Sequence, residues 1–158
     1  MFKKPQLSLK GRALRYLSMR EHSRLELARK LAPYVQEGED LEEVLNFLER
    51  SNFLSNQRFS ESLVNRRQAR FGNQRIFAEL GNHDLSAEDI AEVKEKLQDS
   101  ELERAIEVLH KKFSKAPADH MEKAKQMKFL MQRGFSSKAV QQALRAPRPE
   151  DHADSFDH

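Results

Sequence analysis

The sequence predicts an all-α protein built from three tandem three-helix repeats, stacked into an elongated, curved helical array. Charged residues make up 34% and hydrophobic residues 38% of the 158-residue chain, a balance that suits amphipathic helices and leaves little for a broad buried sheet. Five glycines and five prolines are too few for a loop-rich β protein. Helix signals also recur at an even spacing, which is typical of a repeat protein.

The first three helices are expected to begin near residues 8, 23 and 40. Leu9 and Ala13 belong to an apolar stripe with helical spacing over the first helix. Ser23 and Glu26 form a capping box, in which the serine hydroxyl accepts from the amide three residues on. Asp40 then precedes an amphipathic third helix whose first turn is acidic, as the helix dipole favours.

The same order follows twice more along the chain. Asn56, Asn73 and Ser86 are the expected caps of helices four to six. A seventh helix is expected near residue 100, and Asp119 and Ser136 should cap the eighth and ninth. The starts near 8, 56 and 100, near 23, 73 and 119, and near 40, 86 and 136 are all 44 to 50 residues apart. This spacing favours three repeats over the alternative of nine helices in one irregular bundle.

The expected boundaries are an N-terminal extension at 1–8, repeats at 9–54, 55–98 and 99–145, and a tail at 146–158. The tail has two prolines, four acidic residues and one large apolar residue, so it is expected to be disordered. Two interpretations of the tail are open: it competes with nucleic acid for a basic surface, or it only makes the chain more soluble.

Charge alternates in blocks along the chain although the net charge is only +3. Residues 1–36 carry +7, 37–51 carry −5, 52–80 carry +3, 81–103 carry −6 and 104–148 carry +8. The first two helices of each repeat are therefore mainly basic. If the repeats stack regularly, these helices form one long positive surface that suits nucleic acid.

Lysines and arginines of these basic helices are the candidate phosphate-binding residues. They are Arg24, Arg29, Lys30, Arg66, Arg67, Arg70, Arg75, Lys123, Lys125, Lys128 and Arg133. Free amides at the helix start at Asn73 are expected to add an anion site. The alternative interpretation is a solvated helix face and an ordinary cap. Phe129 and Phe135 are expected in the core, while Phe71 is either a core residue or a base-stacking one.

Several classes of function lack the residues they need. The chain has no cysteine, which excludes disulfides and thiolate catalysis. Its six histidines have no metal-ligand spacing, and no nucleotide-binding glycine loop or nucleophile elbow occurs. We therefore expect that the chain binds no cofactor and no metal and that it is not an enzyme. With no run of eighteen apolar residues, the chain is expected to be a soluble, cytoplasmic monomer without membrane contact.

An ordered set of motifs over roughly residues 9–145 resembles the bacterial regulatory protein RecX family. These motifs are Ala13-Leu14-Arg15-Tyr16-Leu17, Arg20-Glu21-His22-Ser23-Arg24, Glu26-Leu27, Lys30-Leu31, Phe53-Leu54, Arg58-Phe59, Arg66, Phe71-Gly72, Ile76, Glu79-Leu80 and Lys128-Phe129-Leu130-Met131-Gln132-Arg133-Gly134-Phe135-Ser136. Asp84 stands where the family commonly has glycine, yet aspartate tolerates the left-handed conformation that this turn needs.

The resemblance implies tandem three-helix repeats and a modulator, usually an inhibitor, of RecA. Such a protein binds the RecA–DNA filament, suppresses its ATP hydrolysis, strand exchange and co-protease activity, and has no catalytic residue of its own. The family is also credited with DNA binding, here expected to be weak and non-specific toward single and double strands. Groove blocking, filament-end capping and loosening of subunit contacts are all open as modes of inhibition. The alternative function is a helix-turn-helix module that acts directly on duplex DNA without RecA.

Overall fold

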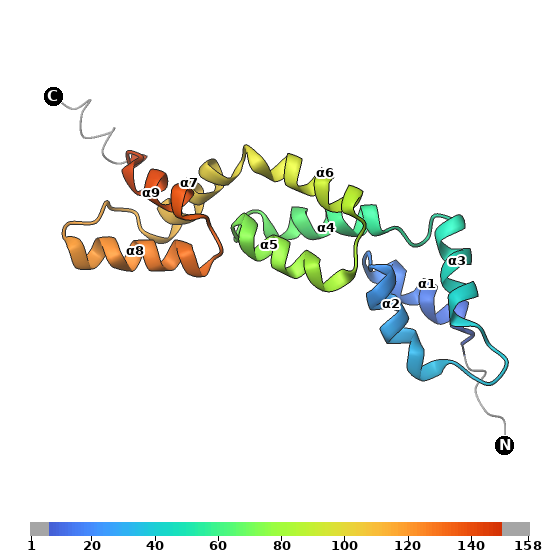
Figure 1. Cartoon of the computed structure of the whole chain (residues 1–158). Helices are drawn as coiled ribbons and strands as arrows, with labels where there is room; N and C mark the ends of the chain where they lie inside the picture. Colours follow the sequence, from blue (N-terminus) through green and yellow to red (C-terminus); the bar gives the residue numbers. More distant parts are fainter. Residues whose placement is uncertain (1–6, 150–158) are drawn as a thin grey trace, which may run out of the picture. The chain divides into compact units, whose positions relative to one another are not determined.

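The structure is a computed structural model that describes residues 7–149, and within that range it contains nine α-helices and two short 3-10 helices (Figure 1). The α-helices are α1 Leu9–Met19, α2 Arg24–Leu31, α3 Leu41–Arg50, α4 Asn56–Arg67, α5 Asn73–Leu80, α6 Ala87–Gln98, α7 Glu101–Lys112, α8 His120–Gln132 and α9 Ser137–Arg145. The 3-10 helices are η1 Ala32–Tyr34 and η2 Gly81–His83. The all-helical prediction is confirmed, and each helix begins within one residue of its expected start.

Several of the expected helix caps are present. The Ser23 hydroxyl accepts from the Glu26 amide at 3.1 Å, and the Ser136 hydroxyl accepts from the Ala139 amide at 3.2 Å. The Asp119 carboxylate accepts from the amide of Glu122 at 2.9 Å. These bonds satisfy amides that the first helical turn leaves without a partner inside the helix, so local sequence alone determines these starts.

Two predicted caps are wrong, because the asparagines contact neighbouring helices instead. Asn56 is the first residue of α4, and the Ser55 hydroxyl caps this helix by accepting from the Arg58 amide. The Asn56 side chain accepts from the Arg24 amide at 2.8 Å. Asn73 is likewise the first residue of α5, and its side chain donates to the Leu97 carbonyl oxygen at 3.2 Å. Both asparagines therefore join helices rather than cap their own.

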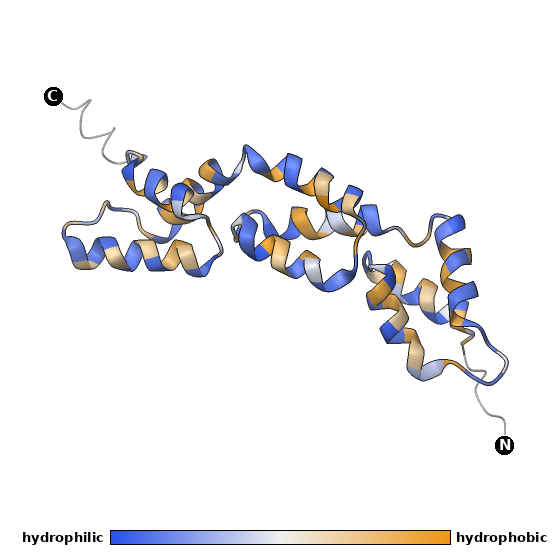
Figure 2. Ribbon diagram, in the orientation of Figure 1, coloured by the Kyte–Doolittle hydropathy of each residue, from blue (hydrophilic) through white to orange (hydrophobic). Residues whose placement is uncertain are grey.

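The chain forms two compact units, residues 1–63 with 80–90 and residues 64–79 with 91–158. In the first unit α1, α2 and α3 pack around a leucine-rich core. This core contains Leu9, Ala13, Leu27, Leu31, Leu45, Leu48 and Leu54. Orange and blue residues alternate along these helices in Figure 2, as expected for amphipathic helices with one buried face. The finer division into repeats at 9–54, 55–98 and 99–145 stays a prediction.

The second unit has its core between α7, α8 and α9. The buried residues are Ala105, Val108, Leu109, Leu130, Phe135, Ala139, Val140 and Ala143. Phe135 is only 2% exposed and Phe129 packs against this core from a partly buried position, so the core prediction holds for both. Asp84 has a φ of +51°, which confirms the left-handed turn expected before α6, and Gly134 has a φ of +88° at the corresponding turn before α9.

The predicted disordered tail falls mainly on residues 150–158, which lie outside the described residues. In its described part Arg148 is 1% exposed and donates from Nη2 to the Gln126 Oε1 at 2.6 Å. Packing against α8 therefore continues beyond the expected boundary at residue 145. Among the helices of residues 7–149, none combines the length and the apolar character needed to cross a lipid bilayer.

Candidate nucleic-acid interface

Two glycines bring the end of α8 against the start of α5 in the second unit. The Gly72 amide donates to the Arg133 carbonyl oxygen at 2.8 Å, and the Gln74 amide donates to the Gly134 carbonyl oxygen at 3.1 Å. A Cβ on Gly72 would lie 2.3 Å from the Phe135 nitrogen, so only glycine allows this approach. The contact brings the side chains before and after Gly72 next to those at the end of α8.

Three arginines consequently surround one aromatic ring. The guanidinium carbons of Arg70, Arg75 and Arg133 lie 5.6, 4.1 and 5.5 Å from the centre of the Phe71 ring. Each is within the range of a cation–π contact, which partly offsets the repulsion between like charges. We call Arg70, Phe71, Arg75 and Arg133 the Phe71 cluster. All three arginines are among the candidates predicted from the sequence, and the structure brings them together from three segments of the chain.

The positive charge of the Phe71 cluster has no carboxylate partner among the residues that the structure describes. Within residues 7–149, none of its three arginines forms an ion pair. Arg70 and Arg75 are exposed and Arg133 is half-buried. Exposed guanidinium groups without carboxylate partners favour binding of an external anion, and their planar fork matches a phosphate.

Two buried charges, which the sequence prediction missed, hold the backbone of this cluster. Arg104, 8% exposed, donates to the carbonyl oxygens of Gln68 at 2.9 Å and Phe71 at 2.7 Å. Glu101, 9% exposed, accepts from the Asn73 amide at 2.9 Å. Burial lowers the pKa of the Arg104 guanidinium, which still remains charged near neutral pH. A signal was present, because Glu101 lies four residues before the buried Ala105 and Arg104 lies four residues before the buried Val108, which is the spacing of one helix face.

The predicted anion site at the start of α5 is wrong. The Asn73 amide donates to Glu101, and the Gln74 amide donates to Gly134. These amides are used inside the protein because α7 and the end of α8 pack against this helix start. Anion binding in this region therefore depends on side chains rather than on the α5 amides.

A hollow of about 320 Å³ adjoins the Phe71 cluster. It is lined by Ala69, Arg70, Val108, Lys111, Lys112, Phe129 and Arg133. Four of these side chains are cationic, and the Arg133 guanidinium also lies 5.1 Å from the centre of the Phe129 ring. Lys111 and Lys112 were not among the candidate residues, although they end a predicted basic helix. They add two ammonium groups to the same surface.

Three candidates are engaged inside the protein. Arg67 donates to both carboxylate oxygens of Glu79, at 3.0 and 3.1 Å. Arg24 pairs with Glu49 and Glu42, each at 2.8 Å, and its hydrogen bond with Glu49 raises its pKa. The Lys30 ammonium group contacts His22 Nε2 at 2.9 Å. These side chains hold helices together and offer less available charge than the Phe71 cluster does.

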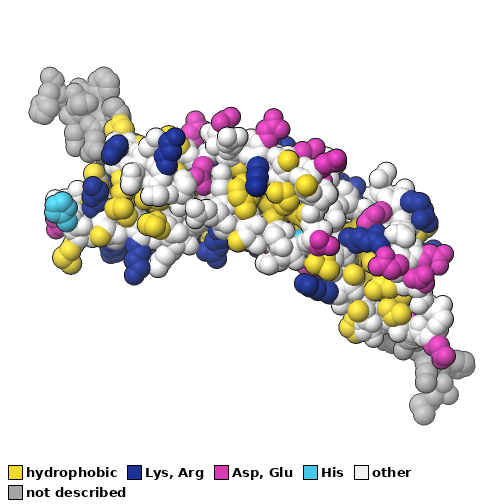
Figure 3. All heavy atoms as spheres, viewed as in Figure 1, with side chains coloured by type: hydrophobic (Ala, Val, Ile, Leu, Met, Phe, Trp, Pro, Cys, Tyr) yellow, Lys and Arg dark blue, Asp and Glu magenta, His cyan; other side chains and the backbone are white. Residues whose placement is uncertain are grey.

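The remaining candidates are exposed. They are Arg29, Arg66, Lys123, Lys125 and Lys128. Figure 3 shows Lys and Arg side chains over α8, whereas Asp and Glu side chains gather over α3 and α6. Their charge is therefore accessible on each unit, and a single positive surface across the chain stays a prediction. In the described part of the chain, no three potential metal ligands gather at one place.

Two protein-family models match the chain, one near each end of its folded part. Residues 99–144 match the model described as "RecX, third three-helix domain", and residues 10–48 match "RecX, first three-helix domain". The chain is 60% identical to "Regulatory protein RecX" of Herbaspirillum seropedicae over 141 residues, which cover 89% of this chain and 92% of that protein. It is 59% identical to the protein of the same name from Herminiimonas arsenicoxydans over 143 residues, 90% of this chain and 95% of that one.

Solved structures show the same fold at low sequence identity. The crystal structure of RecX from Lactobacillus salivarius matches with a TM-score of 0.71 and 20% identity, covering 87% of this chain and 92% of that chain. A second structure, "Crystal structure of regulatory protein RecX", matches with a TM-score of 0.70 and 17% identity over 92% of this chain and 83% of that chain. The helical arrangement is therefore shared at identities as low as these.

Proposed function

This chain belongs to the RecX family of regulatory proteins, and on that premise we propose that it restrains RecA by binding the RecA–DNA filament through the Phe71 cluster. As a member of this family, the chain is a modulator of RecA and not an enzyme. The proposal concerns how it reaches the filament and which side chains it uses.

One observation carries the proposal: Arg70, Arg75 and Arg133 surround Phe71 without ion pairs inside residues 7–149. Such a group is costly to keep together unless an external anion occupies it, since like charges repel at short range. A nucleic-acid backbone supplies that anion at regular spacing, and Lys111 and Lys112 extend the contact beside the cluster. This supports DNA in the filament as the ligand of the cluster.

The other exposed candidates extend this contact, and the carboxylate-paired ones support it indirectly. Arg29, Arg66, Lys123, Lys125 and Lys128 add positive charge near the filament, while Arg24 and Arg67 fix the helices that carry it. The Lys30 ammonium group keeps its contact with His22. Binding of bare single or double strands by such side chains is weak, salt-dependent and without sequence preference, and we propose that the chain acts as a monomer.

RecA-driven ATP hydrolysis on single-stranded DNA tests the proposal. ATP hydrolysis should fall as the chain is added in stoichiometric amounts, and the inhibition should weaken as salt rises, because phosphate contacts release counterions. Strand exchange and co-protease activity should fall in parallel. Unchanged ATP hydrolysis at stoichiometric amounts would contradict the proposal. Tight, sequence-selective binding to bare duplex would instead support a helix-turn-helix module that acts without RecA.

A further inference from the structure

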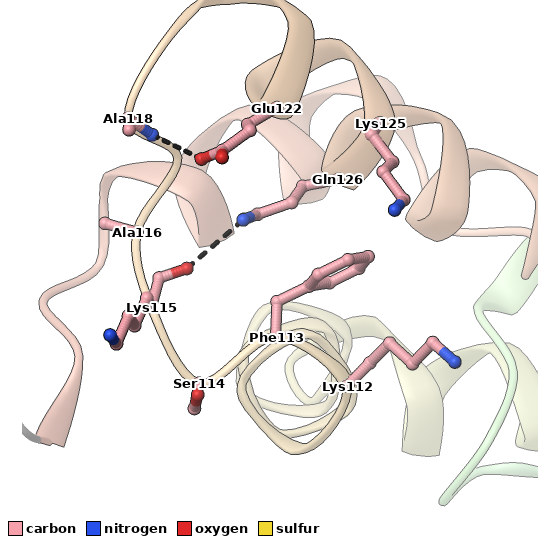
Figure 4. A pocket seen from close by; sticks show the side chains of 9 residues that line it. All are labelled: Lys112, Phe113, Ser114, Lys115, Ala116, Ala118, Glu122, Lys125 and Gln126. Carbon is pink, nitrogen blue, oxygen red and sulfur yellow. Dashed lines mark hydrogen bonds between the residues drawn. The ribbon is translucent and has the colours of Figure 1, made fainter.

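A second hollow, which shares Lys112 with the hollow beside the Phe71 cluster, has a volume of about 460 Å³. It is lined by Lys112, Phe113, Ser114, Lys115, Ala116, Ala118, Glu122, Lys125 and Gln126. Figure 4 shows the Phe113 ring between the side chains of Lys112 and Lys125. The lining contains a single carboxylate, Glu122, which accepts from the Ala118 amide at 2.7 Å. We call this space the lysine hollow.

A buried anchor brings the C-terminal end of the described chain to the lysine hollow. Gln126, 3% exposed, donates to the Lys115 carbonyl oxygen at 3.2 Å and accepts from Arg148 at 2.6 Å. Arg148 is itself 1% exposed. The chain therefore leaves its described part at Pro149, one residue beyond a side chain that is fixed to the wall of this hollow. The segment after Pro149 is therefore tethered one residue from a side chain that is hydrogen-bonded to the lining.

The sequence that follows complements the lysine hollow in charge and in apolar character. Residues 150–158 contain four carboxylates, no lysine or arginine, and one large apolar residue, Phe156. Phe156 is seven residues beyond Pro149, and seven extended residues reach about 23 Å. That reach allows the carboxylates to meet the ammonium groups of the hollow and the Phe156 ring to meet that of Phe113.

We propose that the lysine hollow receives residues 150–158 of the same chain, and that nucleic acid must displace this tail to use the surface around Lys112. A short tether gives an effective concentration of about 1 mM, so a tail that binds with a dissociation constant of about 0.1 mM is docked about nine-tenths of the time. The apparent affinity for nucleic acid then falls about tenfold. The docking of the tail does not depend on the proposed function, whereas this loss of affinity for nucleic acid rests on the proposed function.

Docking can be measured without DNA or RecA, because the chain has no tryptophan. Phe156→Trp gives a single reporter in the intact chain. We expect blue-shifted emission and protection from acrylamide at low salt, and an emission spectrum of exposed tryptophan at about 0.5 M salt, where charge is strongly screened. An exposed reporter at low salt would overturn the proposal.

A matched pair of variants locates the docking site in this reporter chain. Lys112→Gln with Lys115→Gln and Lys125→Gln should expose the tryptophan. The same change of charge at three exposed lysines outside the hollow, Lys10→Gln with Lys94→Gln and Lys138→Gln, should leave it protected. Equal exposure in both sets would mean that only net charge matters, and would overturn the assignment to this hollow.

The consequence for nucleic acid is tested by neutralising the tail. Glu150→Gln with Asp151→Asn, Asp154→Asn and Asp157→Asn should raise the affinity for a single-stranded oligonucleotide about tenfold at low salt. In the background with the three hollow lysines changed, the same tail change should have less than about a twofold effect, since coupled sites are not additive. An equal gain in both backgrounds would overturn the competition. Protected tryptophan without RecA inhibition would contradict only the proposed function.

Discussion

In each unit, the first residue of one helix accepts from the first amide of the α-helix two places before it, but the accepting groups differ in chemistry. In the first unit the first residue of α4, Asn56, accepts from the amide of Arg24, the first residue of α2. In the second unit the first residue of α7, Glu101, accepts from the amide of Asn73, the first residue of α5. A neutral amide thus does in one joint what a carboxylate does in the other.

The two joints also differ in the additional contacts that surround them. The first joint adds a hydrogen bond between Ser23 and His83 at 2.7 Å. The second adds the buried Arg104 and a backbone contact between Gly72 and Gly134. Buried charges are stabilising only when they are paired and hydrogen-bonded, so the second joint is the more rigidly specified one. It is also the joint that holds the Phe71 cluster, which links rigidity to the proposed interface.

Glu101→Ala gives the largest expected loss of stability. It removes the acceptor of the Asn73 amide and of the Ser136 hydroxyl, which donates at 2.6 Å, and it leaves Arg104 as a buried charge without its neighbour. Breaking such a buried group should lower the free energy of unfolding by about 4 kcal/mol. Urea unfolding followed by circular dichroism measures it. A loss below about 1 kcal/mol, the range of an exposed pair, would show that this joint is no more specified than the first.

Gly72→Ala tests the backbone contact in the same joint. The new Cβ would lie 2.4 Å from the Gly134 carbonyl oxygen, so α8 must shift, at a cost of about 3 kcal/mol. The arginines of the Phe71 cluster should separate with it. Gly81→Ala is the matched control, because no atom lies within 4 Å of its Cβ position and the change should stay within about 0.5 kcal/mol. Equal unfolding midpoints for the two variants would rule out the close approach.

Asn56→Ala tests the joint of the first unit, in which a neutral side-chain amide is the acceptor. It removes one side-chain acceptor and leaves the Arg24 amide unsatisfied, so the free energy of unfolding should fall by about 1 kcal/mol. The comparison with Glu101→Ala is made under identical urea conditions. If Asn56→Ala cost as much as Glu101→Ala, the contrast between a neutral and a charged joint would be lost.

The smallest expected effect is a loss of stability at acidic pH, and it comes from His22 in the first unit. His22 is 1% exposed, and its Nδ1 lies 3.0 Å from the Arg20 carbonyl oxygen while its Nε2 faces Lys30. Burial lowers its pKa, with the Arg20 and Lys30 charges acting in the same direction and the hydrogen bond to Arg20 and the Glu26 charge opposing them. The unfolded chain therefore binds a proton near pH 6.5 that the folded chain binds only at lower pH.

The stability contributed by neutral His22 is thus complete above about pH 6.5 and is lost as pH falls below it. Urea midpoints at pH 7.5 and 5.5 should differ in the parent chain and differ less in His22→Gln. Burial also lowers the pKa of the half-buried His110 in the second unit, so His110→Gln is the comparison variant and should flatten the profile less. A pH dependence unchanged by His22→Gln would be evidence against a buried neutral imidazole.

The sequence predicted what local signals determine and missed what distant packing determines. Helix starts followed from caps such as Ser23 and Ser136, whose bonds close within three residues. Gly134 has the left-handed conformation of a local helix end, but its contact with Gly72 joins residues 62 positions apart, and no local pattern reports such a contact. Asn56 and Asn73 failed as predicted caps for the same reason, since their partners come from other helices.

The candidate site shows the same limit. Arg67 and Arg75 are alike in a list of basic residues, yet one is paired with Glu79 and the other lies over Phe71. Which arginine has a carboxylate partner depends on tertiary packing, because surface charges near each other in space are often far apart in sequence. Charge counting therefore located the basic helices but could not rank the residues on them.

The central claim is that arginines without carboxylate partners bind the filament while paired ones hold the fold. The most direct measurement compares Arg75→Gln with Arg133→Gln against Arg24→Gln with Arg67→Gln, as the concentration of chain that halves RecA-driven ATP hydrolysis. We predict a rise of at least about tenfold for the first pair, with a salt slope smaller by about two, and less than about threefold for the second. Equal effects in the two pairs, or a larger effect in the second with both variants folded by circular dichroism, would contradict the claim.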